Sequence, residues 1–505
     1  MIMRRIDSAL LASALSGLLL AAAFPRPDIY PLAWVGLIPM LMVMHRRPFA
    51  AGFTAGVFFF SAVLYWLNIV MTTYGGLQTF FSLLAYLFLV VYLAAYIGTV
   101  TWLACRLKDV LKLPYLATVP FLWVAFEYLR GTLLTGFPWA LLGYSQHNFS
   151  TAIQSADVTG VYGVSFLLVS VNCTIAWMIT EPRNRLAWLG LGIVLLMTGT
   201  HLGYGTWRNS QPVEQRDNKL RVALIQGNID QAQKWVAENR QATIDRYKAL
   251  STQALQQPSD LLIWPEAATP FFVQDDSGPA QQVLSLPEEL NVPLLFGSPA
   301  YHQLDDGRYE YFNSAFLLSE EGRTLGRSDK VHLVPFGEYV PLGRLLSFID
   351  KLVVGVGDFS QGQIRPLALN NNNIGVLICY EAIFPHLARD YVRKGSRLLV
   401  NLTNDAWFGR SSAPYQHLAM VKFRAIENRI WLARAANTGI SAFISPGGRV
   451  VAASPLFQPF SLNGVIGLGA ETTFYTRFGD LFAYVCLGLS FAFLGAMFFK
   501  RKLSS

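Results

Sequence analysis

Cys379 is the residue whose type and position most strongly suggest nucleophilic chemistry. It lies at the end of an apolar run with the sequence NIGVLIC and is followed by Tyr380 and Glu381. The other three cysteines lie inside long apolar runs, where a small thiol is typical of packing; they are Cys105, Cys173 and Cys486. Taken alone, Cys379 is either an inert core thiol or a nucleophile, and both interpretations stay open.

A nucleophilic cysteine needs a base, because the thiolate is the reactive form and the free thiol has a pKa of about 8.5. Histidine is the usual partner, but His332, His386 and His417 have no obvious oriented acidic or amide partner in the sequence. A glutamate can accept the thiol proton, and a lysine can favour the thiolate and stabilise an oxyanion. The candidates are Glu266, after the apolar run LLIWP, and Lys330, which begins the segment KVHLVPFGE. Each of the two, taken singly, is equally compatible with a solvated surface charge.

The spacing of possible metal ligands does not indicate a metal site. The sequence contains neither HExxH nor CxxC, the spacings of common zinc sites. Four cysteines in 505 residues also exclude a disulfide scaffold. We therefore expect neither a metal nor another cofactor.

The composition is that of a membrane protein. Hydrophobic residues make up 53% of the chain and charged residues only 14%, against about 25% charged in an ordinary soluble domain. A wholly soluble protein and a disordered chain are both excluded. Eight apolar runs approach the roughly 20 residues that a membrane-spanning helix needs, and they cover residues 8–24, 29–44, 48–71, 77–105, 113–129, 158–180, 186–204 and 478–499.

The charges between these runs predict an orientation. Short turns rich in Lys and Arg mark the cytoplasmic side of a membrane. Such residues gather at alternate turns: Arg4, Arg5, Arg46, Arg47, Arg106, Lys108, Lys112, Arg183, Arg185, Lys500, Arg501 and Lys502. The opposite short turns hold only Arg26 and Arg130. We expect both termini to be cytoplasmic, with the polar stretch 205–475 on the far side, which in a bacterial inner membrane is the periplasm. The net charge of +8 then reflects membrane anchoring and not nucleic-acid binding.

The first apolar run has a second interpretation. Arg4 and Arg5, an apolar run and the small residues Ala21–Ala23 resemble a cleavable signal peptide. Cleavage would leave the orientation of the later runs unchanged.

The stretch 205–475 alternates β-rich and helical patterns. Short apolar strands are predicted at 220–229, 261–264, 293–297, 312–318, 373–380 and 398–402, with helices at 232–256, 385–394 and 414–433 and further β-rich segments around 440–454. Such alternation predicts helices packed over sheets. The chain thus divides into a bundle of seven helices (1–204), an extracytoplasmic α/β domain (205–475), and an eighth helix with a short tail (476–505).

The segments around the three candidate residues resemble the carbon–nitrogen hydrolase (nitrilase) superfamily. The matching segments are WPE at 264–266, KVHLVPFGEYVP at 330–341, CYE at 379–381 and NDAWFG at 404–409. With eight membrane runs around this domain, the whole chain is similar to the apolipoprotein N-acyltransferase family. The resemblance implies a fold that joins an α-helical membrane bundle of eight transmembrane helices to a nitrilase-like αββα sandwich.

The resemblance also implies a reaction. Cys379 would attack the sn-1 ester of a phospholipid, with phosphatidylethanolamine the expected donor, and carry the acyl group as a thioester. The acceptor would be the α-amino group of a diacylglyceryl-cysteine on an apolipoprotein. Glu266 would move the protons, while Lys330 and the backbone N–H of Tyr380 would hold the oxyanion. Glu338 is expected to orient Lys330, and Glu381 to support the site.

Apolar residues other than Glu266, Lys330 and Cys379 are also consistent with a lipid substrate. Leu345 and Leu346 lie in an apolar stretch, 340–356, which either forms a lid at the headgroup region or docks on the membrane helices. Trp139 is either an interfacial anchor or part of an acyl-chain entrance. Trp407 and Phe408 either line the pocket or fill an aromatic core.

Two further functions stay open on the sequence. One is a membrane-tethered amidase or nitrilase that passes the acyl group to water. The other is a transporter or receptor in which the sandwich is a non-catalytic binding domain.

Overall fold

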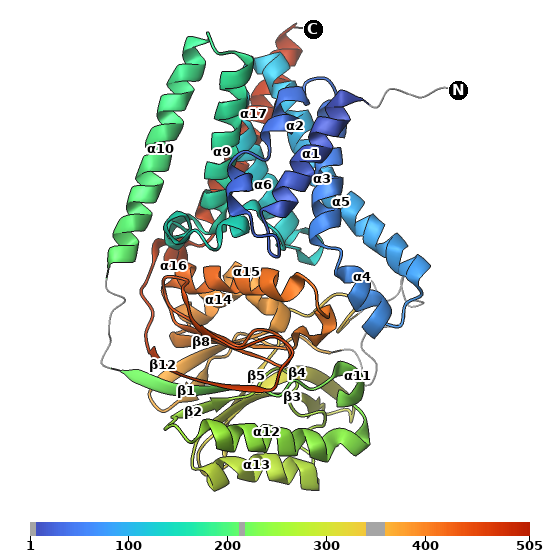
Figure 1. Ribbon diagram of the computed structural model, residues 1–505, viewed down its shortest axis with the longest axis vertical. Coiled ribbons are helices and arrows are strands. Elements are labelled where there is room, and N and C mark those ends of the chain that lie inside the picture. Colours follow the sequence, from blue (N-terminus) through green and yellow to red (C-terminus); the bar gives the residue numbers. More distant parts are fainter. Residues whose placement is uncertain (1–6, 212–217, 340–358, 505) are drawn as a thin grey trace. The chain divides into compact units, whose positions relative to one another are not determined.

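The structure is a computed structural model, and it describes residues 7–211, 218–339 and 359–504. These residues form two compact units (Figure 1). The helical unit takes in the described parts of Met1–Asn68, Gln78–Gln211 and Phe478–Ser505. The α/β unit takes in Ile69–Leu77 and the described parts of Pro212–Arg477. A nine-residue piece of chain that joins the apolar runs 48–71 and 77–105, and includes the last residues of the first, therefore belongs to the α/β unit.

Helices underlie every apolar run, but they differ in length. Four helices are long and apolar enough to cross a membrane: α5 (Thr79–Leu111), α9 (Val161–Thr180), α10 (Arg185–Ser210) and α17 (Leu481–Ser504). A fifth span is possible if α3 (Pro48–Val63) and the segment Leu67–Tyr74 count as one span, bent by 56°. That segment comprises α4 (Leu67–Ile69) and the π-helical turn η2 (Val70–Tyr74). The eight predicted spans are therefore matched by four or five helices that meet this criterion in the described residues.

The remaining runs are divided or shortened. The run 29–44 splits into the 3₁₀ turn η1 (Tyr30–Trp34) and the short helix α2 (Ile38–Val43), because Pro31 and Pro39 each sit in the first turn of a new helix, where the missing N–H is tolerated. Helices α1 (Ser8–Ala22) and α6 (Val119–Thr132) have 15 and 14 residues. The short pieces that complete this unit are η3 (Tyr115–Ala117), η4 (Leu133–Thr135), η5 (Leu142–Gln146), α7 (Ser150–Ile153) and α8 (Ala156–Thr159).

Small residues let helices of this unit pack closely. Gly52 and Gly56 lie one turn apart on α3 and face α5. A Cβ atom added at Gly56 would lie 2.7 Å from the Cα of Ala94. Such a Gly-xxx-Gly pair brings two backbones together where the surroundings offer no hydrophobic drive to associate.

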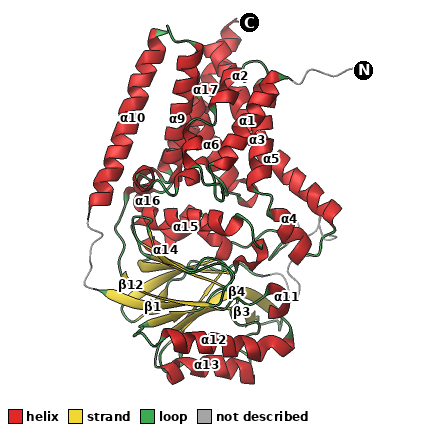
Figure 2. Cartoon of the chain, viewed as in Figure 1, coloured by secondary structure: helices red, strands yellow, loops and turns green. Residues whose placement is uncertain are grey.

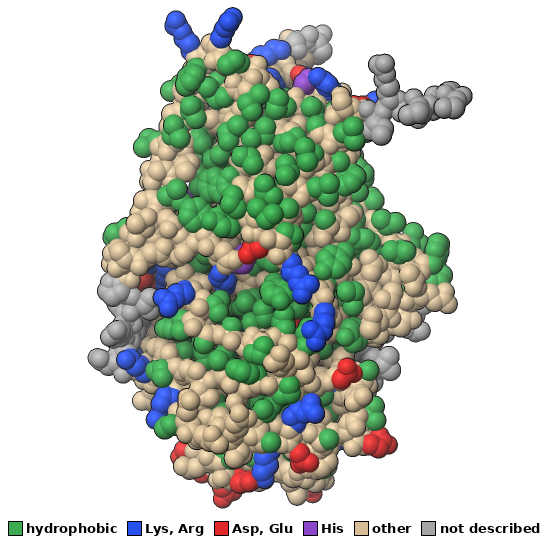
Figure 3. Space-filling view, in the orientation of Figure 1, with side chains coloured by type: hydrophobic (Ala, Val, Ile, Leu, Met, Phe, Trp, Pro, Cys, Tyr) green, Lys and Arg blue, Asp and Glu red, His purple; other side chains and the backbone are tan. Residues whose placement is uncertain are grey.

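Apolar side chains also cover the outside of the helical unit (Figure 3). On α10, Leu186, Leu195 and Leu196 are more than half exposed. An exposed apolar surface of this extent is typical of a lipid-facing bundle.

Two six-stranded sheets form the centre of the α/β unit (Figure 2). The first sheet has the order β12-β1-β2-β3-β4-β5 and the second β11-β10-β9-β8-β7-β6. Their bounds are β1 (Lys219–Gln226), β2 (Leu261–Ile263), β3 (Leu294–Gln303), β4 (Tyr309–Leu318), β5 (Thr324–Asp329), β6 (Leu367–Leu369), β7 (Asn372–Ile378), β8 (Ser396–Thr403), β9 (Leu432–Ala436), β10 (Ala442–Ile444), β11 (Val450–Ala453) and β12 (Phe460–Gly467).

Helices cover the outer face of each sheet, so the unit is an αββα sandwich. The first sheet is covered by α12 (Arg240–Ala254) and α13 (Gly278–Leu290), and the second by α14 (Pro385–Arg393) and α15 (Ala413–Asn428) (Figure 2). Between the sheets lies an apolar core that includes Val222, Leu224, Val376 and Leu402. The two sheets and their helices agree with the nitrilase-like architecture that the resemblance implies.

The prediction of one helix over 232–256 is wrong over residues 232–239. The chain forms the short helix α11 (Gln231–Lys234) and then the 3₁₀ turn η6 (Ala237–Asn239) before α12 begins. The Lys234 side chain of α11 is fully buried. A single straight helix over the whole range does not form, because α11 turns this polar side chain into the interior and α12 has its own apolar face against β1.

Leu402→Ala tests the core between the sheets. Leu402 is completely buried in that core, so truncation leaves a cavity and costs about 2–5 kcal/mol. We expect a melting temperature several degrees below that of the unmodified protein, measured by thermal unfolding in detergent. The control is Leu325→Ala on β5, where the side chain is 45% exposed. Equal shifts in the two variants would contradict the described core.

Candidate active site

Glu266 lies just past the carboxyl end of β2, in a turn that the first sheet holds closely. Gly297 on β3 packs against this turn, and a Cβ atom there would lie 2.6 Å from the Cα of Glu266. The Gly297 N–H donates to the Pro265 carbonyl at 3.1 Å. Beside the turn, Trp264 is fully buried and its indole N–H donates to Ser251 at 3.0 Å. The main chain at Glu266 is therefore rigid.

The Glu266 carboxylate accepts from groups of both sheets. Its Oε1 accepts the side-chain amide of Asn313 on β4 at 2.8 Å. Its Oε2 accepts the backbone N–H of Asn404, which follows β8, at 2.9 Å. The ammonium of Lys330 lies 3.6 Å from Oε1. Each oxygen accepts a hydrogen bond and the cation lies beside Oε1, so the carboxylate is held in one orientation.

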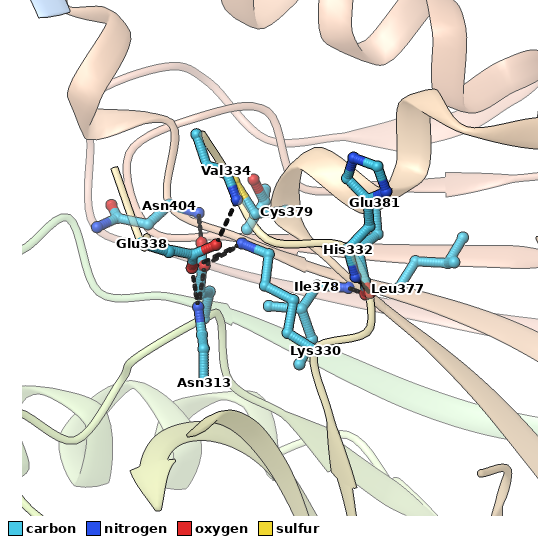
Figure 4. A network of polar contacts seen from close by, with 12 residues as sticks. Asn313, Lys330, His332, Val334, Glu338, Leu377, Ile378, Cys379, Glu381 and Asn404 are labelled. Atoms are coloured by element: carbon cyan, nitrogen blue, oxygen red, sulfur yellow. Dashed lines mark hydrogen bonds and ion pairs between the residues drawn. The ribbon is translucent and has the colours of Figure 1, made fainter. Parts of the chain in front are cut away.

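Lys330 follows β5 and points its ammonium into the same place (Figure 4). Its Nζ donates to Oε1 of Glu338 at 2.9 Å, and only 1% of the residue is exposed. Burial opposes the charge on Lys330, but Glu338 and then Glu266 outweigh it and raise the pKa of the ammonium above its ordinary value. The predicted contact between Glu338 and Lys330 is present.

Asn313 links the two carboxylates, and the sequence analysis did not identify it. Its Nδ2 lies 2.8 Å from Glu266 Oε1 and 2.8 Å from Glu338 Oε1 (Figure 4). The second Glu338 oxygen accepts the Val334 N–H at 2.9 Å. One amide therefore supplies both of its N–H groups to two buried acids. The signal in the sequence was slight: a polar residue within the buried strand FNSAFLL.

Cys379 follows β7 and begins the 3₁₀ turn η7 (Cys379–Ile383). Its φ angle is +54°, in the left-handed region that residues other than glycine rarely adopt. Strained backbone of this kind collects at functional sites, where the surrounding structure holds it in place. A nucleophile on a sharp turn after a strand has its side chain presented at the end of the sheet.

Glu381 holds this turn. Its Oε1 accepts the backbone N–H groups of Val331 at 2.6 Å and His332 at 3.0 Å, and its Oε2 accepts that of Ile378 at 2.6 Å. It thereby ties the turn after β7 to the segment after β5. Burial raises the pKa of Glu381 to about 7 in spite of these donors. The neighbouring Tyr380 packs edge-on against Phe384, with ring centroids 5.1 Å apart.

The Cys379 thiol is protonated at rest. Burial, and after it the charge of Glu266, raises its pKa to about 12, whereas Lys330 acts in the opposite direction. Transfer of the thiol proton to Glu266 would remove the negative charge that opposes ionisation and leave the thiolate beside an ammonium. The arrangement therefore suits proton transfer inside the site better than loss of the proton to water.

A buried charged cluster lies beside Cys379. Asp405 contacts Arg434 at 2.6 Å and His417 Nδ1 at 3.2 Å, and all three side chains are fully buried. His417 thus has an acidic partner that was not obvious in the sequence. Although burial opposes it, Arg434 with His417 lowers the pKa of Asp405 to about 2. Arg434 also donates to Asn401, whose amide donates to the Leu377 carbonyl at 2.9 Å, so this cluster supports the end of β7.

The predicted substrate-binding residues belong to different units of the chain. Trp407 lies in η8 (Asp405–Phe408), with its ring 5.6 Å from that of Tyr74, and Phe408 lies 6.3 Å from the ring of His417. Trp139 belongs to the helical unit, where it is 1% exposed and packs on Trp66 at 4.8 Å. Leu345 and Leu346 lie outside the described residues. The roles of all five in substrate binding stay predictions.

Metal-ligand clusters are absent from the part of the chain that the structure describes. No group of three or more His, Cys, Asp and Glu side chains in residues 7–211, 218–339 and 359–504 is arranged to hold a metal ion.

Two family models match the chain. The model described as the apolipoprotein N-acyltransferase N-terminal domain matches residues 16–174, and the carbon–nitrogen hydrolase model matches residues 221–459. The second match contains all three of Glu266, Lys330 and Cys379.

Curated relatives match from end to end. A protein of Geobacter metallireducens named apolipoprotein N-acyltransferase is 47% identical, over 97% of this chain and 95% of the relative. One of the same name from Nitrosomonas europaea is 34% identical over 95% of each chain. Among solved structures, a carbon–nitrogen hydrolase from Helicobacter pylori G27 is 17% identical, covering 49% of this chain and 89% of its own, with a TM-score of 0.38.

Lys330→Met tests the electrostatic role of the buried ammonium. Because Lys330 is a cation that lowers the pKa of Cys379, its loss removes an effect worth about one pKa unit or more. We expect iodoacetamide to alkylate Cys379 at least about tenfold more slowly at pH 7.5, measured by mass spectrometry of the Cys379 peptide. The exposed Lys219→Met is the control, and thermal unfolding verifies that each variant is folded. An unchanged alkylation rate in a folded Lys330→Met protein would contradict this electrostatic account.

Proposed function

The chain belongs to the apolipoprotein N-acyltransferase family and is an acyltransferase, and we propose that it transfers a fatty acyl chain from the sn-1 position of a phospholipid to the α-amino group of an N-terminal diacylglyceryl-cysteine. The observation that carries this proposal is the buried group of Glu266, Lys330 and Glu338 beside the strained turn at Cys379. Phosphatidylethanolamine is the proposed donor and an apolipoprotein the proposed acceptor.

The first half-reaction forms a thioester. Glu266 takes the thiol proton, and Cys379 Sγ attacks the ester carbonyl carbon. The carbonyl oxygen becomes an oxyanion beside the Lys330 ammonium and the Tyr380 N–H. The bond from this carbon to the glycerol oxygen then breaks, and Glu266 returns its proton to that oxygen, so a lysophospholipid leaves.

The second half-reaction transfers the acyl group. Glu266 takes a proton from the acceptor amine, whose nitrogen attacks the thioester carbon. The tetrahedral oxyanion occupies the same place as before. The carbon–sulfur bond breaks, Glu266 gives the proton that it took from the amine to the Cys379 sulfur, and an amide is released. In this scheme Glu266 returns to its starting protonation state at the end of each half-reaction.

We also propose the membrane arrangement. The shorter apolar helices would cross the membrane together with the four long ones, which gives eight spans. The first apolar run would be retained, and both termini would be cytoplasmic. Residues 1–204 and 476–505 would lie in a bacterial inner membrane, and residues 205–475 would form the periplasmic catalytic domain. The alternation of basic residues along the chain supports this orientation.

Mass spectrometry of the Cys379 peptide after exposure to phospholipid tests the nucleophile. We expect a mass gain of one fatty acyl group in the unmodified protein and none in Cys379→Ala. The buried membrane thiol provides the control, since Cys486→Ala should still form the acyl-enzyme. Rapid release of free fatty acid without an amine acceptor would instead favour a membrane-tethered hydrolase, and full activity of Cys379→Ala would favour a non-catalytic sandwich domain.

Glu266→Gln tests the base. The amide has nearly the shape of the acid but does not accept the thiol proton, so we expect acyl-enzyme formation to slow by about 10²–10⁴-fold. The rate is followed by release of lysophospholipid in a single turnover. Exposed Glu289→Gln on α13 is the matched control. A Glu266→Gln protein with near-normal rates would exclude Glu266 as the base.

A further inference from the structure

We infer that Lys234 is a positioning residue of the catalytic site: it fixes the main chain of Glu266 and supplies a second buried positive charge that keeps the site electrically balanced. The inference rests on the proposed function for its catalytic meaning, but not for its electrostatic test.

Lys234 contacts the main chain of Glu266, whereas other groups hold its carboxylate. It ends α11, its side chain is fully buried, and its Nζ donates to the Glu266 carbonyl oxygen at 3.3 Å. The same short helix also supports the carboxylate. Gln231 Oε1 accepts the Asn404 side-chain amide at 2.6 Å, and the Asn404 backbone N–H donates to Glu266 Oε2. Both ends of Glu266 thus depend on α11.

A buried ammonium with a single carbonyl acceptor is costly unless an anion lies near. Burial lowers the pKa of Lys234 to about 8, and the charge of Glu266 acts against this effect. Lys234 is therefore protonated at neutral pH and coupled to Glu266. A lysine that served only to fill space would be replaced at lower cost by an apolar side chain of similar length.

Among the described residues that contact the Glu266 and Glu338 side chains or the Glu266 main chain, the charges cancel when Lys234 is included. Glu266 and Glu338 are the two acids, and Lys330 is the cation on their carboxylate side. Lys234 provides the second positive charge, so the group is neutral while Cys379 is a thiol. When the thiol proton moves to Glu266, the net charge of the group stays zero. It also stays zero when the thiolate attacks, because the negative charge then passes from the sulfur to the oxyanion.

Two other acids lie near the site in the described part of the chain, and each has partners of its own. Asp405 is paired with Arg434 and His417. Glu381 lies beyond Lys330 and is held by three backbone N–H groups. Removal of the Lys234 charge therefore acts first on Glu266, without a further cation to replace it among these contacts, and after burial Glu266 is the charge that raises the pKa of the Cys379 thiol.

Alkylation of Cys379 by iodoacetamide as a function of pH, in the full-length protein in detergent, tests the inference. Three variants separate charge from hydrogen bonding: Lys234→Arg keeps both, Lys234→Gln keeps a donor without the charge, and Lys234→Met keeps neither. We expect Lys234→Gln and Lys234→Met to alkylate Cys379 a few-fold more slowly than the unmodified protein at pH 7, where Lys234 carries its charge, and the rates to converge above about pH 8, where the unmodified lysine loses its proton. Lys234→Arg should stay near the unmodified profile, and exposed Lys248→Met on α12 is the control.

The outcomes are distinguishable. A folded Lys234→Gln protein with an unchanged alkylation profile would overturn the charge-balancing role. Equal decreases of the alkylation rate in Lys234→Arg and Lys234→Met would show that Lys234 acts only by packing. If Lys234→Met does not fold, Lys234→Gln and Lys234→Arg still decide the matter, because both keep a polar donor. Acyl-enzyme formation from phosphatidylethanolamine in the unmodified protein is measured in parallel, and its failure would contradict the proposed function while leaving the alkylation result valid.

Discussion

A positive charge buried between two acids organises the catalytic unit. Removing an ammonium from water costs several kcal/mol unless its partners are close and well oriented. Lys330 meets this condition through Glu338 at 2.9 Å and Glu266 at 3.6 Å. The acids in turn need donors of their own, which Asn313, Asn404 and Val334 supply. Loss of one member would leave an uncompensated buried charge, so the group is best regarded as a single electrostatic unit.

The two sheets of the sandwich hold this group of charges in place. Glu266, Lys330 and Asn313 come from the first sheet, and Cys379 and Asn404 follow strands of the second. Contacts such as that from the Asn404 N–H to Glu266 therefore join the two sheets at their edge. The left-handed turn at Cys379 is maintained by Glu381 on one side and by the Asn401–Arg434 contact on the other. Rigid strands on both sides place reactive groups more accurately than mobile loops would.

Glu266 and Cys379 were predictable because each follows an apolar run, which is a local signal, whereas Lys330 was identified from the segment KVHLVPFGE that carries the resemblance. Asn313 lies within a strand and Lys234 in a pattern that suggests a surface helix, so nothing local distinguishes them from ordinary polar residues. Arg434 is hidden in the same way on β9. The αββα architecture was implied by resemblance, and the apolar runs all form helices. Their subdivision depends on prolines and on packing partners far along the chain, as at Pro39. Strand β12 was not predicted, since its partner β1 lies more than two hundred residues earlier.

The pairing of β1 with β12 determines when the first sheet can be completed during synthesis of the chain. Strand β1 has β2 on one side and β12 on the other, with Leu220 opposite Ile466. The first sheet is therefore incomplete while the ribosome is still adding the residues that precede β12. During that interval β1 presents unpaired backbone groups to whatever surrounds it. Translation at about 5–20 residues per second makes this a period of many seconds. A nascent chain of this topology would benefit from a chaperone that occupies the open edge of β1 until the last strand arrives.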